Sequence, residues 1–312
     1  DEKINQEDTS YTEYEISRIW QQLLNTKNIG LDDDFFDLGG NSLLAIRLIT
    51  DLNKKMQSNI DIGEIFRQRT IRLLAKYINK GDLSHFVSPF QVFNLRKPQK
   101  VFFFPPALAF GFVFGRLALE LKNHEIIAFN YIHKKNTILE YAKIMQELQP
   151  SGNFIMAGFS SGGSLAFEVT KALEEQGREV SDIILLDSKM NKIADLLSDE
   201  QCSEIADSFL KDPRAEEYIL GEEQKKLMWG TIKKCAKFIH SLENTGTIKT
   251  QIHLITSDNN HENPSRFKDW NDATEDVLKI YRGKGKHDEM LDPQNFEHNK
   301  NVFTSILGDL EV

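Results

Sequence analysis

A serine set among glycines, in the segment GFSSGG at residues 158–163, lies between two apolar segments. Residues Asn153–Ala157 before it have the pattern of a buried strand, and Ser164–Glu175 after it have the pattern of a helix. A tight turn from strand to helix strains the serine backbone, and neighbouring side chains would obstruct it. The glycines therefore predict that Ser160 stands on such a turn with its hydroxyl exposed as a nucleophile. The alternative is a glycine-rich turn that only begins a helix.

The composition is that of an ordinary globular protein, with 312 residues, 40% of them hydrophobic and 27% charged. A net charge of −9 and the lack of a Lys/Arg-rich stretch argue against general nucleic-acid binding. No apolar run is long enough for a membrane span, and the polar start Asp1–Ser10 is unlike a signal peptide. Cys202 and Cys235 lack metal-binding spacing, so we expect no metal and a reduced, cytoplasmic setting. Because the chain begins with Asp1 rather than Met, we expect it to be a segment of a longer protein.

The first part of the chain, residues 1–82, is expected to form a small helical domain. Apolar residues recur there at helical spacing, without the alternation typical of strands. The helix at Ser42–Lys55 should turn Leu43, Ile46 and Ile49 inward, and Ser10 and Thr12 offer caps for the first helix. The four expected helices are Glu13–Leu24, Ser42–Lys55, Ile62–Arg67 and Ile71–Ile78. A joint follows within Gly81–Ser88, and we place the linker at residues 83–88.

From residue 89 to residue 312, strands alternate with helices, which is typical of a mostly parallel sheet. The expected strands are Gln91–Leu95, Lys100–Phe104, Glu125–Asn130, Asn153–Ala157, Asp182–Leu186, Thr250–Thr256 and Asp276–Tyr281. Between the fifth and sixth lies a long helical insertion, Lys189–Gly246, rich in Lys and Glu. Because it carries many charges, we expect little burial there and interpret the insertion as a mobile lid over the active site.

A serine nucleophile needs a base, and the base needs an acid to orient it. In α/β-hydrolase folds these residues follow the order Ser, then Asp or Glu, then His. Asp187 ends the apolar run beside the nucleophile strand and is the first candidate acid. Its rival is Asp258, after the strand that ends at Thr256, and either residue could instead begin a turn or cap a helix.

His287 is the candidate base among eight histidines. It follows the last expected strand through Gly283-Lys284-Gly285-Lys286, a glycine-rich loop that we expect to be flexible enough to swing an imidazole over the sheet edge. The other histidines precede the required order or lie in strands, helices or polar loops; these are His85, His124, His133, His240, His253, His261 and His298.

Two backbone N–H groups are candidates for an oxyanion hole. One belongs to Ser161, at the start of the helix after the nucleophile. The other belongs to Ala107, because Pro105 and Pro106 after the second strand have no N–H to donate. The alternative for this segment is a proline stop at the end of a strand.

A second serine, Ser42, closes the segment DFFDLGGNS at residues 34–42. A serine at the start of a helix is the usual choice for an N-cap, which is the alternative to a functional role. Beside two glycines it should also lie on the surface, accessible to a modifying enzyme.

The segment FFDLGGNS at residues 35–42 resembles the carrier-protein motif of nonribosomal peptide synthetases, in which the serine bears 4′-phosphopantetheine. The chain from about residue 89 resembles the C-terminal type I thioesterase of the same synthetases, most closely those that release lipopeptides such as surfactin. The matching pieces are FPPA at 104–107, GFSSGG at 158–163, LDS at 186–188, GKGKH at 283–287 and EML at 289–291. Ser161 and Asn41 stand where other residues are more common in the family.

The resemblance implies a four-helix carrier bundle followed by an α/β-hydrolase domain with a helical lid, acting in antibiotic biosynthesis. It favours Asp187 over Asp258 as the acid. It also implies that a peptidyl thioester on the phosphopantetheine of Ser42 passes to Ser160 and leaves by hydrolysis or macrocyclisation. The implied partners are upstream condensation and adenylation domains and a phosphopantetheinyl transferase. Other hypotheses are a proofreading thioesterase, an inert docking module, and a lipase or esterase.

Overall fold

The computed structural model describes residues 11–56, 60–79, 89–94, 97–192, 196–211, 222–261 and 265–309. The chain divides into two compact units, and the first division along the sequence falls between Gln91 and Val92. The expected linker at residues 83–88 and the cap Ser10 lie outside the described residues.

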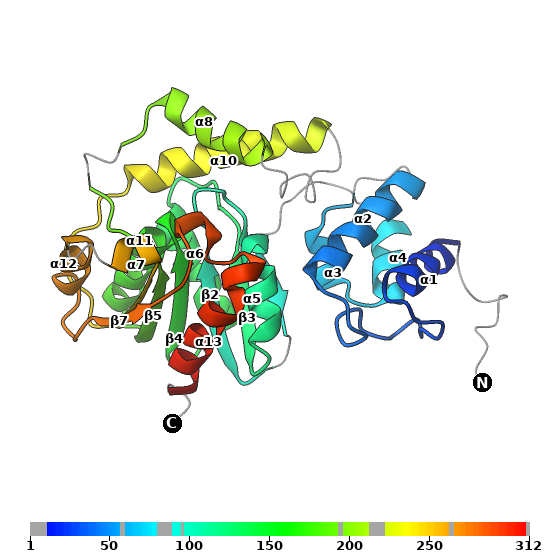
Figure 1. The fold of residues 1–312 in the computed structure, drawn as a ribbon, viewed down its shortest axis with the longest axis horizontal. Helices are drawn as coiled ribbons and strands as arrows, with labels where there is room; N and C mark the ends of the chain where they lie inside the picture. Colours follow the sequence, from blue (N-terminus) through cyan, green and yellow to red (C-terminus); the bar gives the residue numbers. More distant parts are fainter. Residues whose placement is uncertain are drawn as a thin grey trace. The chain divides into compact units, whose positions relative to one another are not determined.

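The first unit contains the four predicted helices. They are α1 Tyr11–Leu23, α2 Ser42–Met56, α3 Gly63–Arg67 and α4 Ile71–Asn79 (Figure 1). Trp20 and Phe35 are fully buried, and their rings meet edge to face with centroids 4.9 Å apart. On α2, Ile46 and Ile49 are buried as predicted, but Leu43 is 42% exposed, so its expected inward position is wrong. The buried face of α2 is centred on Ala45, Ile49 and Leu52, and Leu43 lies about 120° around the helix from Ile49, since a helix has about 3.6 residues per turn.

A seven-stranded sheet has the order β1-β3-β2-β4-β5-β6-β7, and from Val92 onward its strands belong to the second unit. All seven predicted strands form, with boundaries that differ by up to three residues. They are β1 Phe90–Phe93, β2 Gln99–Phe104, β3 His124–Phe129, β4 Phe154–Phe159, β5 Val180–Leu186, β6 Gln251–Thr256 and β7 Lys279–Arg282. The pairs from β3 through β2, β4, β5 and β6 to β7 are parallel, so the ends of these strands gather at one edge.

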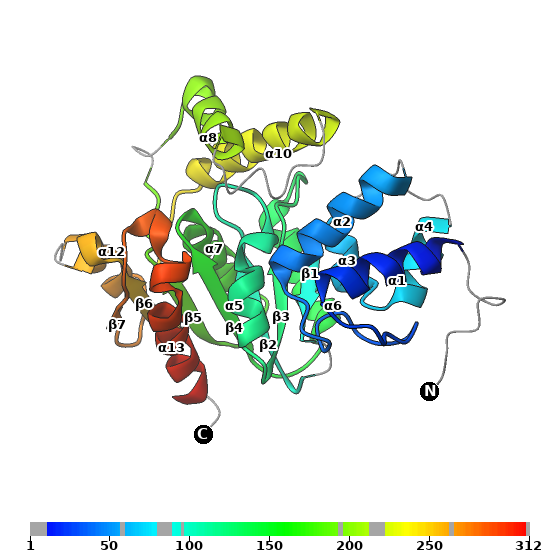
Figure 2. The ribbon, with the colours of Figure 1, turned by 45° about the vertical axis from the view of Figure 1, so that its right-hand side comes forward.

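Helices cover both faces of this sheet (Figures 1 and 2). They are α6 Thr137–Leu148 and α7 Ser161–Glu175 on one face, and α5 Gly115–Glu120, after the short η1 Gly111–Phe114, and α13 Pro293–Asp309 on the other. Two successive residues of β2 illustrate the layers, because neighbouring side chains on a strand point to opposite faces. Phe104 contacts Tyr141 of α6 with ring centroids 5.4 Å apart, whereas Phe103 stacks on Phe303 of α13 at 5.5 Å.

The insertion forms two helices, α8 Asp199–Lys211 and α10 Glu222–Ser241, which lie side by side (Figures 1 and 2). The expectation of little burial is wrong for the second half of α10. Four of its side chains are completely buried: Ile232, Cys235, Ala236 and Ile239. They were hidden from sequence analysis because charged residues stand between them at helical spacing.

The two ends of the insertion are also joined to each other. The backbone N–H of Asn244 donates to the Asn191 carbonyl at 3.0 Å, and the backbone N–H of Asn191 donates to Asn244 Oδ1 at 2.7 Å. The Asn244 amide nitrogen also donates to the carbonyl of Ser164 in α7 at 3.0 Å. The base of the insertion is therefore fixed to the sheet unit.

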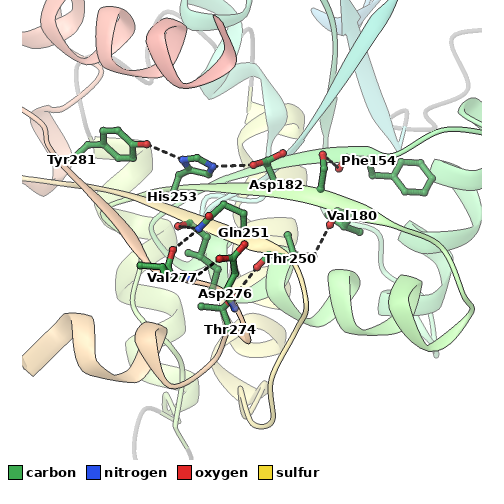
Figure 3. A network of polar contacts seen from close by, with 12 residues as sticks. Phe154, Val180, Asp182, Thr250, Gln251, His253, Thr274, Asp276, Val277 and Tyr281 are labelled. Carbon is green, nitrogen blue, oxygen red and sulfur yellow. Dashed lines mark hydrogen bonds and ion pairs between the residues drawn. The ribbon is translucent and has the colours of Figure 1, made fainter. Parts of the chain in front are cut away.

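A polar network lies within the sheet, between β5, β6 and β7 (Figure 3). His253 Nε2 lies 2.9 Å from Asp182 Oδ1, and His253 Nδ1 lies 3.0 Å from the Tyr281 hydroxyl. His253 and Asp182 are both buried. This second Asp–His pair was not predicted, because a histidine in a strand offers no sign of its cross-strand partners.

Candidate active site

Ser160 lies on the turn between β4 and α7, as the glycines predict. Its φ of 55° and ψ of −129° are a strained combination for a residue with a side chain. The Ser160 N–H donates to the Leu186 carbonyl at 2.9 Å, which ties the turn to the end of β5. The helix begins at Ser161, three residues earlier than predicted, so the candidate nucleophile Ser160 is the residue before the first helical turn.

The glycines of this turn are required by close backbone contacts. A Cβ on Gly158 would lie 2.6 Å from the carbonyl carbon of Gly162. A Cβ on Gly162 would lie 2.5 Å from the Phe104 carbonyl oxygen and 2.8 Å from that of Pro105. Any side chain at these positions would push apart β4, α7 and the loop after β2.

Asp187 follows β5 directly and also has a positive φ, 44°. Its side chain is only 2% exposed. Burial raises the pKa of the Asp187 carboxyl, but hydrogen bonds from His287, Ser257 and Asn260 outweigh burial, so the pKa lies below its ordinary value of 3.8. The carboxylate is therefore held in its charged form.

His287 lies between these two residues. Its Nδ1 is 2.6 Å from Asp187 Oδ2, and its Nε2 is 2.8 Å from Ser160 Oγ. Because the carboxylate can only accept, Nδ1 carries the proton, and Nε2 is left to accept the Ser160 proton. The imidazole also stacks on Phe159, with centroids 5.2 Å apart, and the His287 side chain remains 44% exposed. The structure thus brings together the three residues that the sequence singled out.

The rival acid, Asp258, contacts a different part of the site. Its Oδ2 accepts a hydrogen bond of 2.8 Å from the Gly285 N–H, and its own N–H donates to the Gly285 carbonyl at 3.0 Å. Asp258 begins the short helix α11, Asp258–His261, which also contains His261. That histidine lies 2.9 Å from the Thr256 hydroxyl.

The loop that carries His287 is held from two sides, which opposes the expected freedom to swing. The Gly283 N–H donates to the Thr256 carbonyl at 2.8 Å, and the Lys284 N–H donates to Asn299 Oδ1 at 2.8 Å. Gly285 has a φ of 87°, which suits glycine, and a Cβ there would collide with Asn295 of α13. His287 itself opens a short 3₁₀ turn, η3 His287–Glu289. The glycines in this loop serve close packing.

The candidate oxyanion loop lies against the start of α7, as the contact between Gly162 and Phe104 indicates. Among the hydrogen bonds that join elements in the described ranges, none comes from the N–H of Ala107 or Ser161. On its outer side the loop meets α10, where Cys235 Sγ lies 3.7 Å from the Pro106 carbonyl oxygen. Burial raises the pKa of the Cys235 thiol. The oxyanion role of Ala107 and Ser161 stays a prediction.

Ser42 is the first residue of α2 and does not cap it. Asn41 has that role, since its Oδ1 accepts from the Leu44 N–H at 3.0 Å. The alternative reading of Ser42 as the cap is therefore wrong, whereas its Oγ is less exposed than expected for a modification site. This oxygen is buried and has no hydrogen-bond partner among the described residues. Because Oγ is unused and the first turn of α2 holds no acidic residue, the site fits a phosphate ester at a helix N-terminus.

Within the described ranges, no helix is both long and apolar enough to cross a membrane. The same residues include no group of three or more His, Cys, Asp or Glu side chains arranged to hold a metal ion.

Comparison with known proteins identifies the family. Residues 99–310, well over half of the chain, match the thioesterase domain family. The chain belongs to the thioesterase family. Residues 15–78 match the phosphopantetheine attachment site family, so 4′-phosphopantetheine is the covalent cofactor of the first unit. The predicted fold class, a carrier bundle followed by an α/β-hydrolase thioesterase, is confirmed.

Two of the similar proteins are named as synthases of surfactin and tyrocidine. Surfactin synthase subunit 3 of Bacillus subtilis (strain 168) is 32% identical to this thioesterase over 298 residues, which are 95% of this chain and 23% of that protein. Tyrocidine synthase 3 of Brevibacillus parabrevis is 31% identical over 319 residues, covering 96% of this chain and 5% of that one. This thioesterase thus spans less than a quarter of either synthase.

A solved structure is similar as well. The thioesterase domain described as cyclising the lipopeptide antibiotic surfactin has a TM-score of 0.63 and 31% identity. The match covers 72% of this chain and 98% of that domain.

Proposed function

We propose that this chain releases the finished product of a nonribosomal peptide synthetase by acyl transfer to Ser160. The observation that carries the proposal is the hydrogen-bonded series Ser160 Oγ, His287 and Asp187, with distances of 2.8 and 2.6 Å, in one chain with a carrier domain. That order and geometry are those of a serine acyl-transfer enzyme.

In the first half of the reaction, His287 Nε2 takes the proton of Ser160 Oγ as the oxygen attacks the carbonyl carbon of a thioester. The N–H groups of Ala107 and Ser161 bind the negative oxygen of the tetrahedral intermediate. Asp187 stabilises the imidazolium that forms. The carbon–sulfur bond then breaks, His287 returns the proton to the leaving sulfur, and the acyl group is an ester on Ser160.

In the second half, water or a hydroxyl or amine of the peptide attacks this ester. His287 takes the proton of the attacking group and then gives it to the Ser160 oxygen as the ester bond breaks. Water yields a linear acid, and an internal nucleophile yields a macrocycle. The relative described as cyclising surfactin makes macrocyclisation the product we test first.

We assign Ser42 as the attachment residue. When bound there, phosphopantetheine supplies a thiol that holds the acyl chain as a thioester. Ser42 contributes an oxygen that no group among the described residues hydrogen-bonds, and the N-terminus of α2 is suited to the phosphate charge. We infer a cytoplasmic protein, with a separate phosphopantetheinyl transferase and upstream condensation and adenylation domains as partners.

The test is single-turnover release from the chain's own carrier. A broad-specificity transferase and a synthetic peptidyl-coenzyme A load the protein, and intact mass spectrometry follows the load and the product. The wild type should accept one peptidyl-phosphopantetheinyl group and release the peptide. Ser160→Ala should accept the group and keep it, whereas Ser42→Ala should not be loaded. Rapid release by Ser160→Ala would contradict the proposal.

Two comparisons separate the other hypotheses. An esterase would hydrolyse a free ester at least as fast as the acyl chain loaded on Ser42, whereas chain release requires activity on the carrier-bound chain far above that on a free ester. A proofreading enzyme would clear an acetyl load faster than a peptidyl load, and chain release requires the opposite preference.

A further inference from the structure

The carboxylate of Asp187 is held by three donors, of which only His287 was expected. The Ser257 backbone N–H donates to Oδ1 at 2.9 Å. His287 Nδ1 and the side-chain amide of Asn260 both donate to Oδ2, each at 2.6 Å. An sp² oxygen has two lone pairs, so Oδ2 can accept from His287 and Asn260 together. With both oxygens held, rotation of the carboxylate about its Cβ–Cγ bond is blocked.

Loss of the hydrogen bond between Asn260 and Asp187 would leave Asp187, but not Asn260, without a replacement partner. Asn260 is partly exposed, so water can satisfy its amide if the contact is lost. The Asp187 side chain is only 2% exposed and has no such substitute. The contact joins residues 73 positions apart, from the end of β5 to the short helix α11. The hydrogen bond from Asn260 therefore stabilises the charged form of the Asp187 carboxylate and fixes its orientation toward His287.

The same short helix also holds the loop of the base. Asp258 exchanges two hydrogen bonds with Gly285, one from each backbone N–H, at 2.8 and 3.0 Å. Gly285 lies two residues before His287. The segment after β6 thus contacts the acid through Asn260 and the base's loop through Asp258.

We propose that Asn260 and Asp258 are positioning residues of this site, Asn260 by fixing the oxygen that receives His287 and Asp258 by fixing the loop that presents it. The inference rests on the proposed acyl-transfer function. Neither residue is assigned a step of proton transfer. Asn260 keeps Asp187 charged and aimed, so that His287 holds its proton on Nδ1 and offers Nε2 to Ser160. The lowered pKa of Asp187, to which Asn260 contributes, agrees with this role.

The first test compares Asn260→Leu with Asn259→Leu, the same change at the exposed neighbouring residue. Loss of the donor should lower kcat about tenfold and leave KM unchanged, since one hydrogen bond to a charged group is lost and Asn260 does not touch substrate. The unshared charge on Oδ2 should stabilise the imidazolium, so the acid limb of the kcat/KM profile should move to higher pH. Asn259→Leu should match the wild type in all three quantities.

A second pair of variants keeps the test valid if Asn260→Leu does not fold. Asn260→Asp has the same shape but places a second carboxylate against Oδ2, and the pair can share one proton only at low pH. The kcat of Asn260→Asp should therefore fall as pH rises, over a range in which Asn259→Asp stays constant. If both members of each pair behave alike, Asn260 has no positioning role.

A spectroscopic readout separates this inference from the proposed function. The proton on His287 Nδ1 should give a far-downfield resonance, and Asn260→Leu should shift it while Asn259→Leu leaves it in place. Turnover by Ser160→Ala would overturn the proposed function, whereas an unmoved resonance with an inactive Ser160→Ala would overturn only the inference about Asn260.

The positioning role of Asp258 is tested by removing the hydrogen bond that its side chain accepts from the Gly285 N–H. Asp258→Asn keeps an acceptor oxygen for the Gly285 N–H and should retain activity, whereas Asp258→Leu removes it. Asp258→Leu should lower kcat severalfold and speed hydrogen exchange at the Gly285 amide. Equal kcat and equal exchange in the two variants would overturn the role of Asp258.

Discussion

Asp187 Oδ2 and His287 Nδ1 are 2.6 Å apart, although 100 positions separate the two residues in the chain. The contact requires the end of β5 and the loop after β7 to meet at one edge of the sheet. Parallel strands make that possible, because the strands from β2 to β7 all end on the same side. The imidazole reaches Ser160 from this position, so the activity of the serine should depend on both partners.

Removal of any member of this series should abolish efficient turnover. We expect Ser160→Ala, His287→Ala and Asp187→Asn to lower kcat by roughly 10⁴, by analogy with other serine triads. Single-turnover release from the loaded carrier measures the effect. Asp258→Asn is the matched control for the acid, and loss of turnover in Asp258→Asn with an active Asp187→Asn would show that the acid is misassigned.

The pKa of Asp187 predicts a pH-dependent contribution to stability. Folding lowers this pKa below 3.8, so the folded state binds the proton less readily than the unfolded state. The contribution is fully present above the unfolded pKa and is lost as pH falls through the folded value. In urea unfolding, the stability difference between the wild type and Asp187→Asn should shrink as pH falls below 3.8. A difference that stays constant with pH would contradict this assignment.

The second half of α10 should behave as part of the core. Its buried residues Ile232 to Ile239 should exchange their amide hydrogens nearly as slowly as β4. Cys235 and Cys202 are both buried, and burial raises the pKa of both thiols. Neither should react with iodoacetamide in the native protein, and both should react in denaturant. Rapid native alkylation of Cys235 would show that this helix opens as a lid.

The buried pair His253–Asp182 should stabilise the sheet without serving catalysis (Figure 3). His253→Leu leaves a buried carboxylate without its partner and should lower the free energy of unfolding by about 3–5 kcal/mol. The double variant with Asp182→Leu should lose less than the sum of the two single changes. His298→Leu, an exposed histidine with one backbone contact, should cost less than about 1.5 kcal/mol. A small effect of His253→Leu in urea unfolding would contradict this role.

Much of the fold follows from local patterns along the chain. The seven strands lie where apolar runs predict them, and the helices of the first unit begin and end within about two residues of their predicted limits. The turn at Ser160 follows from Gly158 and Gly162, because only glycine permits the backbone contacts there. Ser160, Asp187 and His287 follow one another along the chain in the order that α/β-hydrolase folds require of a serine, an acid and a histidine. Each of these features depends on residues close together in sequence, or on a topology shared by a whole fold class.

Only the tertiary structure determined the contacts between loops that lie far apart in the sequence. Sequence order alone allowed Asp187 or Asp258 as the acid, and only the folded site shows that the first contacts His287 while the second contacts Gly285. Asn260 has no sequence signal, since its role depends on a carboxylate 73 positions away. The second half of α10 was misjudged for the same reason. Charge along a helix shows which side meets water, but burial of the other side depends on a partner that local sequence does not contain.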